Sequence, residues 1–200
     1  MEKFCDIEHS LVYKYWNDDK YAIISSYVLE EYIKDDIRKN YCKLRCDIRK
    51  LGLGYVPFVI CWEYQVPGRN PILINEWYVL VRNISKRKAV ELGKSVNQKS
   101  IIYKDNFGCN EIYIDDNNAH IISYSYKIST VEDIKNFFIF RQFSLRERQW
   151  ENFDVKLKYI IEILEPQPSY FQIKHRYRII YFDENLSIAD ALNELNKLRR

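Results

Sequence analysis

The hydrophobic period of the chain changes at Gly52, and this change constrains the fold more than any other feature. Before Gly52, apolar side chains recur mostly every three or four residues, as on one face of a helix. These positions are Val28, Ile33, Ile37, Tyr41, Leu44, Ile48 and Leu51. After Gly52, residues 55–64 are rich in β-branched and aromatic side chains, which is typical of a strand. A helix over 26–51, capped at Ser25-Ser26, therefore precedes strands, and an α+β fold is predicted.

The rest of the chain alternates predicted strands with shorter helices. A hairpin or strand pair is expected over 1–24, and single strands at 55–64, 72–81, 99–103, 111–115, 120–127, 152–164 and 170–182. Further helices are expected at 85–94, 130–142 and 187–199, the first of them capped by Ser85. We therefore predict a central, mainly antiparallel sheet flanked by about four helices. Residues 1–127 would form the α+β core, and residues 128–200 a helix-hairpin-helix extension packed on the same domain.

Size and composition indicate a globular protein. The 200 residues are 47% hydrophobic and 30% charged, a balance far from that of disordered chains. No apolar run approaches the roughly 20 residues that cross a bilayer, and the first residues lack a secretory signal. We therefore predict no membrane association and a cytoplasmic location, which for a viral protein would be the host cytoplasm.

The five cysteines are odd in number and form no C-x-x-C pair, so reduced thiols are expected. Cys42 and Cys46 lie four residues apart and would share a helix face. They are either half of a metal site or, as we favour, small apolar filler. Catalytic signatures are missing as well: the sequence has no G-x-S-x-G, no Walker loop and no dinucleotide fingerprint, and its three histidines are scattered. No catalytic residue, metal ligand or cofactor is predicted.

Positive charge is concentrated in two stretches, although the net charge is only +3. Residues 34–50 contain seven Lys or Arg against three Asp, and residues 82–99 contain six against one Glu. Aromatic side chains are interleaved with them, a combination that suits phosphate contact with base stacking. These are Tyr41, Tyr55, Trp77 and Tyr78. The two stretches are the candidate surfaces for an anionic partner.

Glu76 is the acidic residue of most interest, because a lone carboxylate in an apolar strand is costly unless it is paired. One hypothesis joins Glu76 with Glu63, Gln98 and either Arg45 or Arg49 to bind a ligand or metal. The alternative is structural: Glu76 faces outward or forms a salt bridge with Arg45 or Arg49.

Gln98 and Tyr103 faintly resemble the Gln-and-Tyr element of some metal-dependent nucleases, but the accompanying Asp and Glu-x-Lys are not found. The candidate binding residues are thus Arg45, Arg49, Glu63, Glu76, Gln98 and Tyr103.

Three segments carry a resemblance to a known family. They are Leu44-Arg45-x-x-Ile48-Arg49-x-Leu51-Gly52-x-Gly54-Tyr55-x-Pro57, then Glu76-x-x-x-x-Val81, and then Asn97-Gln98-x-x-Ile101-Ile102-Tyr103. In their order and spacing they resemble the uncharacterised DUF3293-type proteins of phages and mobile elements, over residues 20–115. The sequence departs at Trp77, where a small residue is expected. The resemblance implies a fold and a mobile-element context and names no reaction.

Two functions follow as hypotheses. The favoured one is an accessory protein of a virus or mobile element that binds a protein or a nucleic acid without catalysis. The alternative is a small metal-dependent enzyme of nucleic-acid metabolism centred on Glu76. Any nucleic-acid binding is expected to be weak, non-specific and sensitive to salt, because no base-reading motif is present.

Overall fold

The computed structural model describes residues 10–17, 20–26, 34–65, 68, 70–114, 119–124, 133–138, 154–164, 176–183 and 189. The chain divides into two compact units. Unit 1 comprises Met1–Ser10, Val59–Glu76 and Ile128–Arg200, and unit 2 comprises Leu11–Phe58 and Trp77–Lys127. The two units share strands β2 and β3, so each is described by itself.

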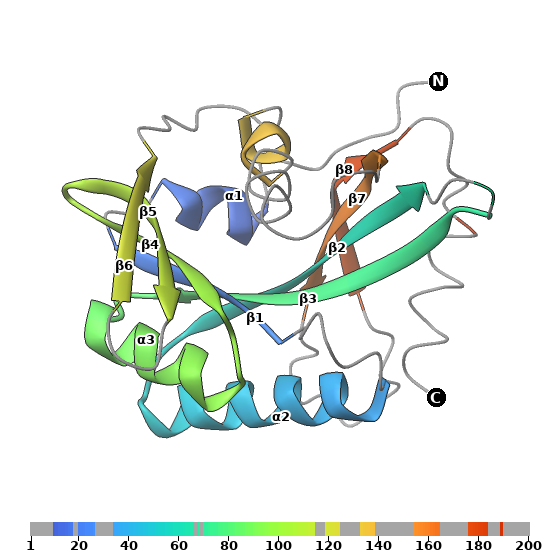
Figure 1. The fold of residues 1–200 in the computed structure, drawn as a ribbon. Helices are drawn as coiled ribbons and strands as arrows, with labels where there is room; N and C mark the ends of the chain where they lie inside the picture. The colour runs from blue at the N-terminus through green and yellow to red at the C-terminus, as the bar shows by residue number, and fades with distance from the viewer. Residues whose placement is uncertain are drawn as a thin grey trace. The chain divides into compact units, whose positions relative to one another are not determined.

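The elements confirm the predicted fold class, α+β with a mainly antiparallel sheet (Figure 1). They are α1 (Leu11–Trp16), β1 (Tyr21–Ser25), α2 (Lys34–Lys50), β2 (Tyr55–Gln65), β3 (Ile72–Arg82), α3 (Lys86–Ser95), β4 (Ser100–Asp105), β5 (Gly108–Ile114), β6 (Ala119–Tyr124), β7 (Asp154–Leu164) and β8 (Arg176–Phe182). Residues 133–138 are also helical. The hydrogen-bonded strand order is β6-β5-β4-β1-β3-β2-β7-β8.

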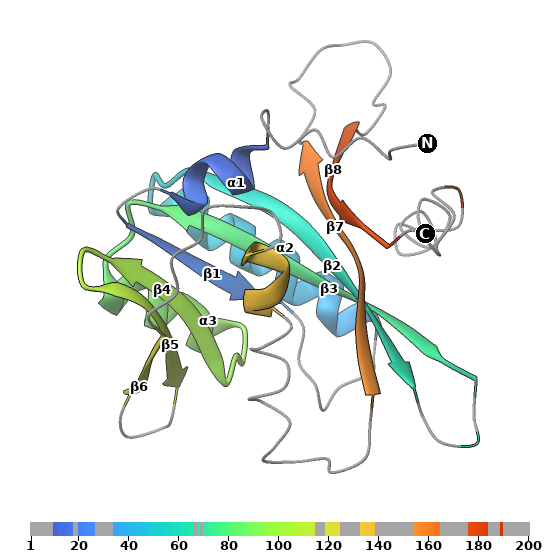
Figure 2. The same cartoon turned by 90° about the horizontal axis from the view of Figure 1, so that it is seen from above.

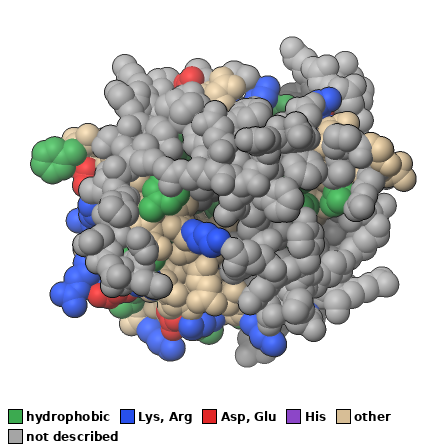
Figure 3. Space-filling model, viewed as in Figure 1, with side chains coloured by type: hydrophobic (Ala, Val, Ile, Leu, Met, Phe, Trp, Pro, Cys, Tyr) green, Lys and Arg blue, Asp and Glu red, His purple; other side chains and the backbone are tan. Residues whose placement is uncertain are grey.

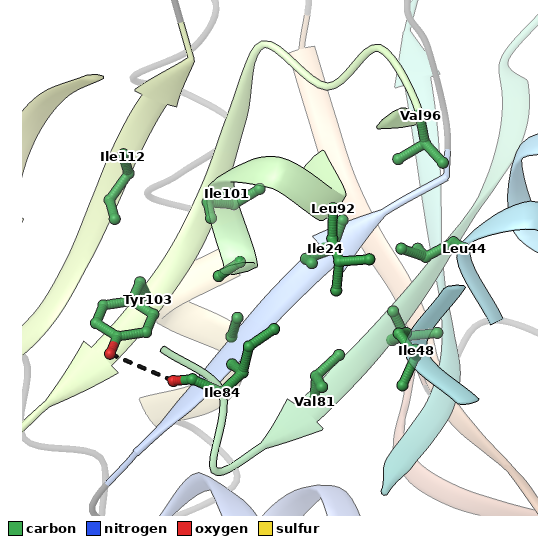
Figure 4. Packing of buried hydrophobic residues seen from close by; sticks show 13 residues of the cluster. Ile24, Leu44, Ile48, Val81, Ile84, Leu92, Val96, Ile101, Tyr103 and Ile112 are labelled. Carbon is green, nitrogen blue, oxygen red and sulfur yellow. Dashed lines mark hydrogen bonds between the residues drawn. The ribbon is translucent and has the colours of Figure 1, made fainter. Parts of the chain in front are cut away.

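An apolar core holds unit 2 together. Alternate residues of β1, β3 and β4 point to one face of the sheet, and α2 and α3 pack their apolar residues against that face (Figures 2 and 4). The buried cluster is Ala22, Ile24, Leu44, Ile48, Val79, Val81, Ile84, Ala89, Leu92, Val96, Ile101, Tyr103 and Ile112. Gly93 lets α3 approach closely, since a Cβ there would lie 2.6 Å from the Ile114 Cδ1 and 2.7 Å from the Ile101 Cγ2.

Where the local sequence signals are strong, the structure has the predicted helix ends and strands. Helix α2 ends at Lys50, and Gly52 follows with a positive φ of 68°, the left-handed conformation that glycine accepts most readily. Ser85 caps α3, its hydroxyl oxygen accepting the backbone N–H of Lys88 at 3.4 Å. The expected strands at 55–64 and 72–81 are β2 and β3.

One expectation at the start of the chain is wrong. Leu11–Trp16 is a helix and not a strand, because Val12 and Trp16 are buried together one helical turn apart. The alternating Tyr13 and Tyr15 suggested a strand, yet both are only half-buried. The Ser26 N–H donates to the Trp77 carbonyl at 2.9 Å and extends the pairing of β1 with β3, while the residues that the predicted Ser25-Ser26 cap would begin lie outside the described part of the chain.

The remaining expected helices are described only in part. The beginning of the predicted 26–51 helix and nearly all of the predicted 187–199 helix lie outside the described residues. In the described parts of the chain, no helix is both long and apolar enough to span a membrane.

Unit 1 is built around the antiparallel pair β7 and β8. Their register places Glu162 opposite Arg178, with an irregularity between Ile160 and Ile161. Strand β7 is buried from Leu157 to Ile163, so this strand carries charged residues in the interior as well as apolar ones.

Candidate functional site

Exposed basic side chains cover the outer side of α2 and α3. We define the α2–α3 face as Arg38, Lys39, Arg49, Lys50, Arg87, Lys88 and Lys94, all of which are exposed. Lys and Arg atoms gather along the lower border of the molecule in Figure 3, where α2 and α3 lie in Figure 1. The helices are neighbours, since the Lys43 ammonium donates a hydrogen bond to the Ser95 carbonyl. The face therefore spans two neighbouring helices of unit 2.

Acidic residues balance only part of this charge. Asp47 accepts a hydrogen bond from Lys50 at 3.0 Å, and Glu91 accepts one from Arg87 at 2.9 Å. Both pairs lie within one helix and are solvent-exposed, where ion pairs contribute little to stability. These two pairs therefore add little to the stability of unit 2.

Beside this face, two arginines contact tyrosine rings. The Arg45 Nε donates to the Tyr55 hydroxyl at 2.9 Å, and its guanidinium lies 5.2 Å from the Tyr41 ring centroid and 5.9 Å from that of Tyr55. The Arg49 guanidinium lies 5.7 Å from the same Tyr55 ring, and the Tyr41 ring is 4.9 Å from that of Trp77. These are cation–π distances. Of the four aromatics predicted among the basic stretches, Tyr41 and Tyr55 contact the arginines, Trp77 contacts Tyr41, and Tyr78 is buried against Phe58. We call Tyr41, Arg45, Arg49, Tyr55 and Trp77 the arginine–aromatic cluster.

Glu76 lies in unit 1, whereas Arg45 and Arg49 belong to unit 2. Its carboxylate is 3% exposed and accepts the indole N–H of Trp62 at 3.0 Å. Glu63 has different partners: it lies 3.5 Å from the Lys158 ammonium and accepts the Gln65 amide at 2.9 Å. Glu63 and Glu76 thus both lie in unit 1, with Lys158 and Trp62 as respective partners.

Gln98 and Tyr103 serve the packing of unit 2. The Gln98 backbone N–H donates to the Gly93 carbonyl at 3.0 Å just past the end of α3. The Tyr103 hydroxyl donates to the Ile84 carbonyl at 3.4 Å (Figure 4), and burial, with the charge of Asp105, raises the pKa of Tyr103. Of the six predicted binding residues, Arg45 and Arg49 lie together, since both guanidinium groups contact the Tyr55 ring.

Unit 1 contains a buried ionic cluster that the sequence reasoning missed. The Lys158 ammonium lies 2.6 Å from the Asp183 carboxylate as well as 3.5 Å from that of Glu63. Burial lowers the pKa of Lys158, but the hydrogen bond and charge of Asp183, together with Glu63, outweigh it, and the pKa lies above its usual value. The ammonium is therefore charged at neutral pH and stabilises the two carboxylates.

Strand β7, which carries Lys158, also carries the buried carboxylate of Glu162. Glu162 is fully buried. Its carboxylate accepts a hydrogen bond from the Ser10 hydroxyl at 2.9 Å and lies 3.4 Å from the Arg178 guanidinium. The signal that could have revealed both groups is a Lys and a Glu within the apolar run from Leu157 to Leu164.

The described residues offer little for metal or thiol chemistry. Among them, no group of three or more His, Cys, Asp or Glu side chains is placed to hold a metal ion. Cys42 and Cys46 are exposed on α2, so the expectation that they fill the core is wrong. Burial raises the pKa of the Cys109 thiol to about 11, so this thiol is protonated and weakly nucleophilic at neutral pH.

Comparison of the chain with family models, with curated proteins and with solved structures finds no match. The resemblance to the DUF3293-type proteins stays a prediction that depends on the order of residues in the sequence.

Proposed function

We propose that the protein acts by binding without catalysis, and that the α2–α3 face holds the phosphate backbone of a nucleic acid. The observation that carries this proposal is the excess of exposed cations on two adjacent helices of one unit. Lys and Arg side chains that contact phosphates supply most of the affinity of non-specific nucleic-acid binding. They need no base-reading motif, which agrees with the sequence.

The arginine–aromatic cluster supports the same proposal. Tyrosine rings beside Arg45 and Arg49 orient planar guanidinium groups at the border of the basic surface. A guanidinium presents several N–H donors in a fixed plane, which matches the oxygens of a phosphate. The accessory role in a virus or mobile element, which the family resemblance implies, belongs to this proposal.

The enzyme alternative lacks comparable support. It depends on Glu76, whose carboxylate accepts a hydrogen bond from Trp62 within unit 1. The alternative stays a prediction, and we do not develop it.

The proposal is tested with two matched double variants in unit 2. Arg38→Gln with Lys94→Gln removes one exposed cation from each helix of the α2–α3 face, while Lys14→Gln with Lys20→Gln removes two exposed cations elsewhere. Fluorescence anisotropy measures binding to a labelled 20-nucleotide strand at low salt. Losing two phosphate contacts should weaken binding roughly tenfold, whereas the control should change it less than about twofold.

Equal weakening by both double variants would show that net charge alone attracts the strand, and the α2–α3 face would lose its role. Circular dichroism of each variant verifies that the fold is retained. All four substituted side chains are exposed, so no loss of folding is expected.

A further inference from the structure

Cys42 and Cys46 lie one helical turn apart on α2, and both are exposed. Helix α2 packs on the apolar core of unit 2 through other residues, among them the fully buried Leu44 and Ile48. Packing in the core therefore does not explain the two thiols. A free cysteine is among the most often buried side chains, so two of them exposed on one helix are unusual. Their shared position points to a use of their sulfur chemistry.

The spacing of the pair suits a bridging atom better than a disulfide. Side chains four residues apart on a helix have Cβ atoms about 5–6 Å apart. A disulfide needs these atoms at about 3.5–4.5 Å, so forming one would distort the helix. Two sulfurs that bind one metal ion at about 2.3 Å each lie up to about 4.6 Å apart, which the undistorted helix allows. Helix α2 thus presents the two thiols as ligands of a single ion.

Exposed cations lie on α2 one turn before the pair and one turn after it. They are Arg38, Lys39, Arg49 and Lys50. The hydrogen bond to Asp47 and the charge of Asp47 raise the pKa of Lys50, and the charge of a Cys46 thiolate raises this pKa further. Lys50 is therefore close enough to Cys46 to stabilise negative charge on its sulfur. Positive surroundings of this kind favour a site whose metal complex is an anion.

We propose that Cys42 and Cys46 together bind one Cu(I) ion as thiolates. Thiolate ligands select soft ions, among them Cu(I) and zinc. Zinc takes three or four protein ligands, whereas no group of three or more His, Cys, Asp or Glu is placed to hold a metal in the described parts of the chain. Cu(I) is satisfied by two thiolates in a nearly linear arrangement. The pair therefore fits Cu(I) without a further ligand.

The charge of the bound state agrees with the place of the site. Binding displaces the two thiol protons, which pass to the solvent, so affinity should rise with pH. One monovalent cation and two thiolates form a complex with a single negative charge. The flanking cations of α2 stabilise this charge, whereas they would oppose a site shared face to face with a second copy of the chain. The inference goes beyond the proposed function and does not depend on it.

The test is an anaerobic competition for Cu(I) between the full chain and bathocuproine disulfonate, a chelator that is coloured when it holds Cu(I). The wild type should take one equivalent of Cu(I) from the chelator and gain the near-ultraviolet absorption of copper–thiolate bonds. Cys42→Ser and Cys46→Ser should each weaken binding by more than about a hundredfold, because losing only a supporting partner of a ligand already costs up to about that much. Both thiols are exposed, so the variants should fold, as circular dichroism verifies.

A matched control keeps two thiols on α2 and separates them. Cys46→Ser combined with Lys50→Cys places the thiols eight residues apart, which is about 12 Å along the helix and too far for one ion. This double variant should bind no better than Cys46→Ser alone. Lys50→Gln removes the same cation but keeps the pair, and it should retain the wild-type affinity within about fivefold, because one exposed charge contributes little.

Several results would overturn the site. They are a wild type that takes no Cu(I) from the chelator, wild-type affinity in Cys42→Ser or Cys46→Ser, and full binding by the separated pair. Cys5→Ser removes a thiol outside the pair and should bind Cu(I) as the wild type does; loss of binding there would mean that two thiols do not suffice. If zinc binds instead and joins two copies, as analytical ultracentrifugation would show, the choice of Cu(I) is wrong.

Discussion

The two units place their charged residues in opposite ways. In unit 1, Lys158 and Arg178 lie in or beside the interior, and each has a carboxylate partner, with Glu162 fully buried. In unit 2, the interior beneath α2 and α3 is an apolar cluster, and the cations lie exposed on the outer side of the two helices. Lys158 and Arg178 therefore stabilise the fold of unit 1, while the cations of the α2–α3 face reach solvent in unit 2.

This difference means that the sequence position of a cation says little about its purpose. Lys158 and Lys156 are two residues apart in β7, yet Lys158 is buried between carboxylates and Lys156 is exposed. The number of lysines and arginines in a stretch predicts a binding surface only where their side chains reach solvent.

The largest expected effect comes from breaking the ionic cluster of unit 1. Lys158→Ala leaves the carboxylates of Glu63 and Asp183 without their shared cation. Removing one partner of a buried ion pair costs about 3–5 kcal/mol, because the remaining charge is stranded. Urea denaturation should show this loss in the free energy of unfolding.

The matched control for that measurement is Lys156→Ala in the same strand, whose side chain is exposed. It should change the free energy of unfolding by less than about 0.5 kcal/mol. If both variants lost a similar free energy of unfolding, alanine itself would destabilise β7, and the loss in Lys158→Ala could not be attributed to its ion pairs.

A much smaller effect is expected from the same kind of change in unit 2. Arg49 is exposed and contacts the Tyr55 ring, so Arg49→Ala should reduce the free energy of unfolding by no more than about 1 kcal/mol. Differential scanning fluorimetry should show nearly the same melting temperature as the wild type. A loss of several kcal/mol would instead support the structural hypothesis, in which Arg49 pairs with a buried carboxylate.

The elements of unit 2 could be predicted where local chemistry specifies them. Gly52 and Ser85 end and begin helices through backbone conformation and capping, which depend on a few neighbouring residues. Helix α1 was missed because Tyr13 and Tyr15 alternate like a strand. The spacing of Val12 and Trp16, both buried, was the signal that would have identified it.

The candidate site was predictable only in part, for a physical reason. The excess of cations and their aromatic neighbours are visible in sequence because they repeat along one helix. The partner of Glu63 is not, since Lys158 approaches it only when the distant strands β2 and β7 pair.

The salt dependence of wild-type binding tests the central claim most directly. If the α2–α3 face neutralises about four to six phosphates, the logarithm of the binding constant should fall with the logarithm of salt concentration at a slope of roughly −3.6 to −5.4 for a duplex. Anisotropy titrations of a labelled duplex between low and near-physiological salt give this slope. Binding that is weak and lost at moderate salt is the predicted result, and tight binding with a slope near zero would contradict the account.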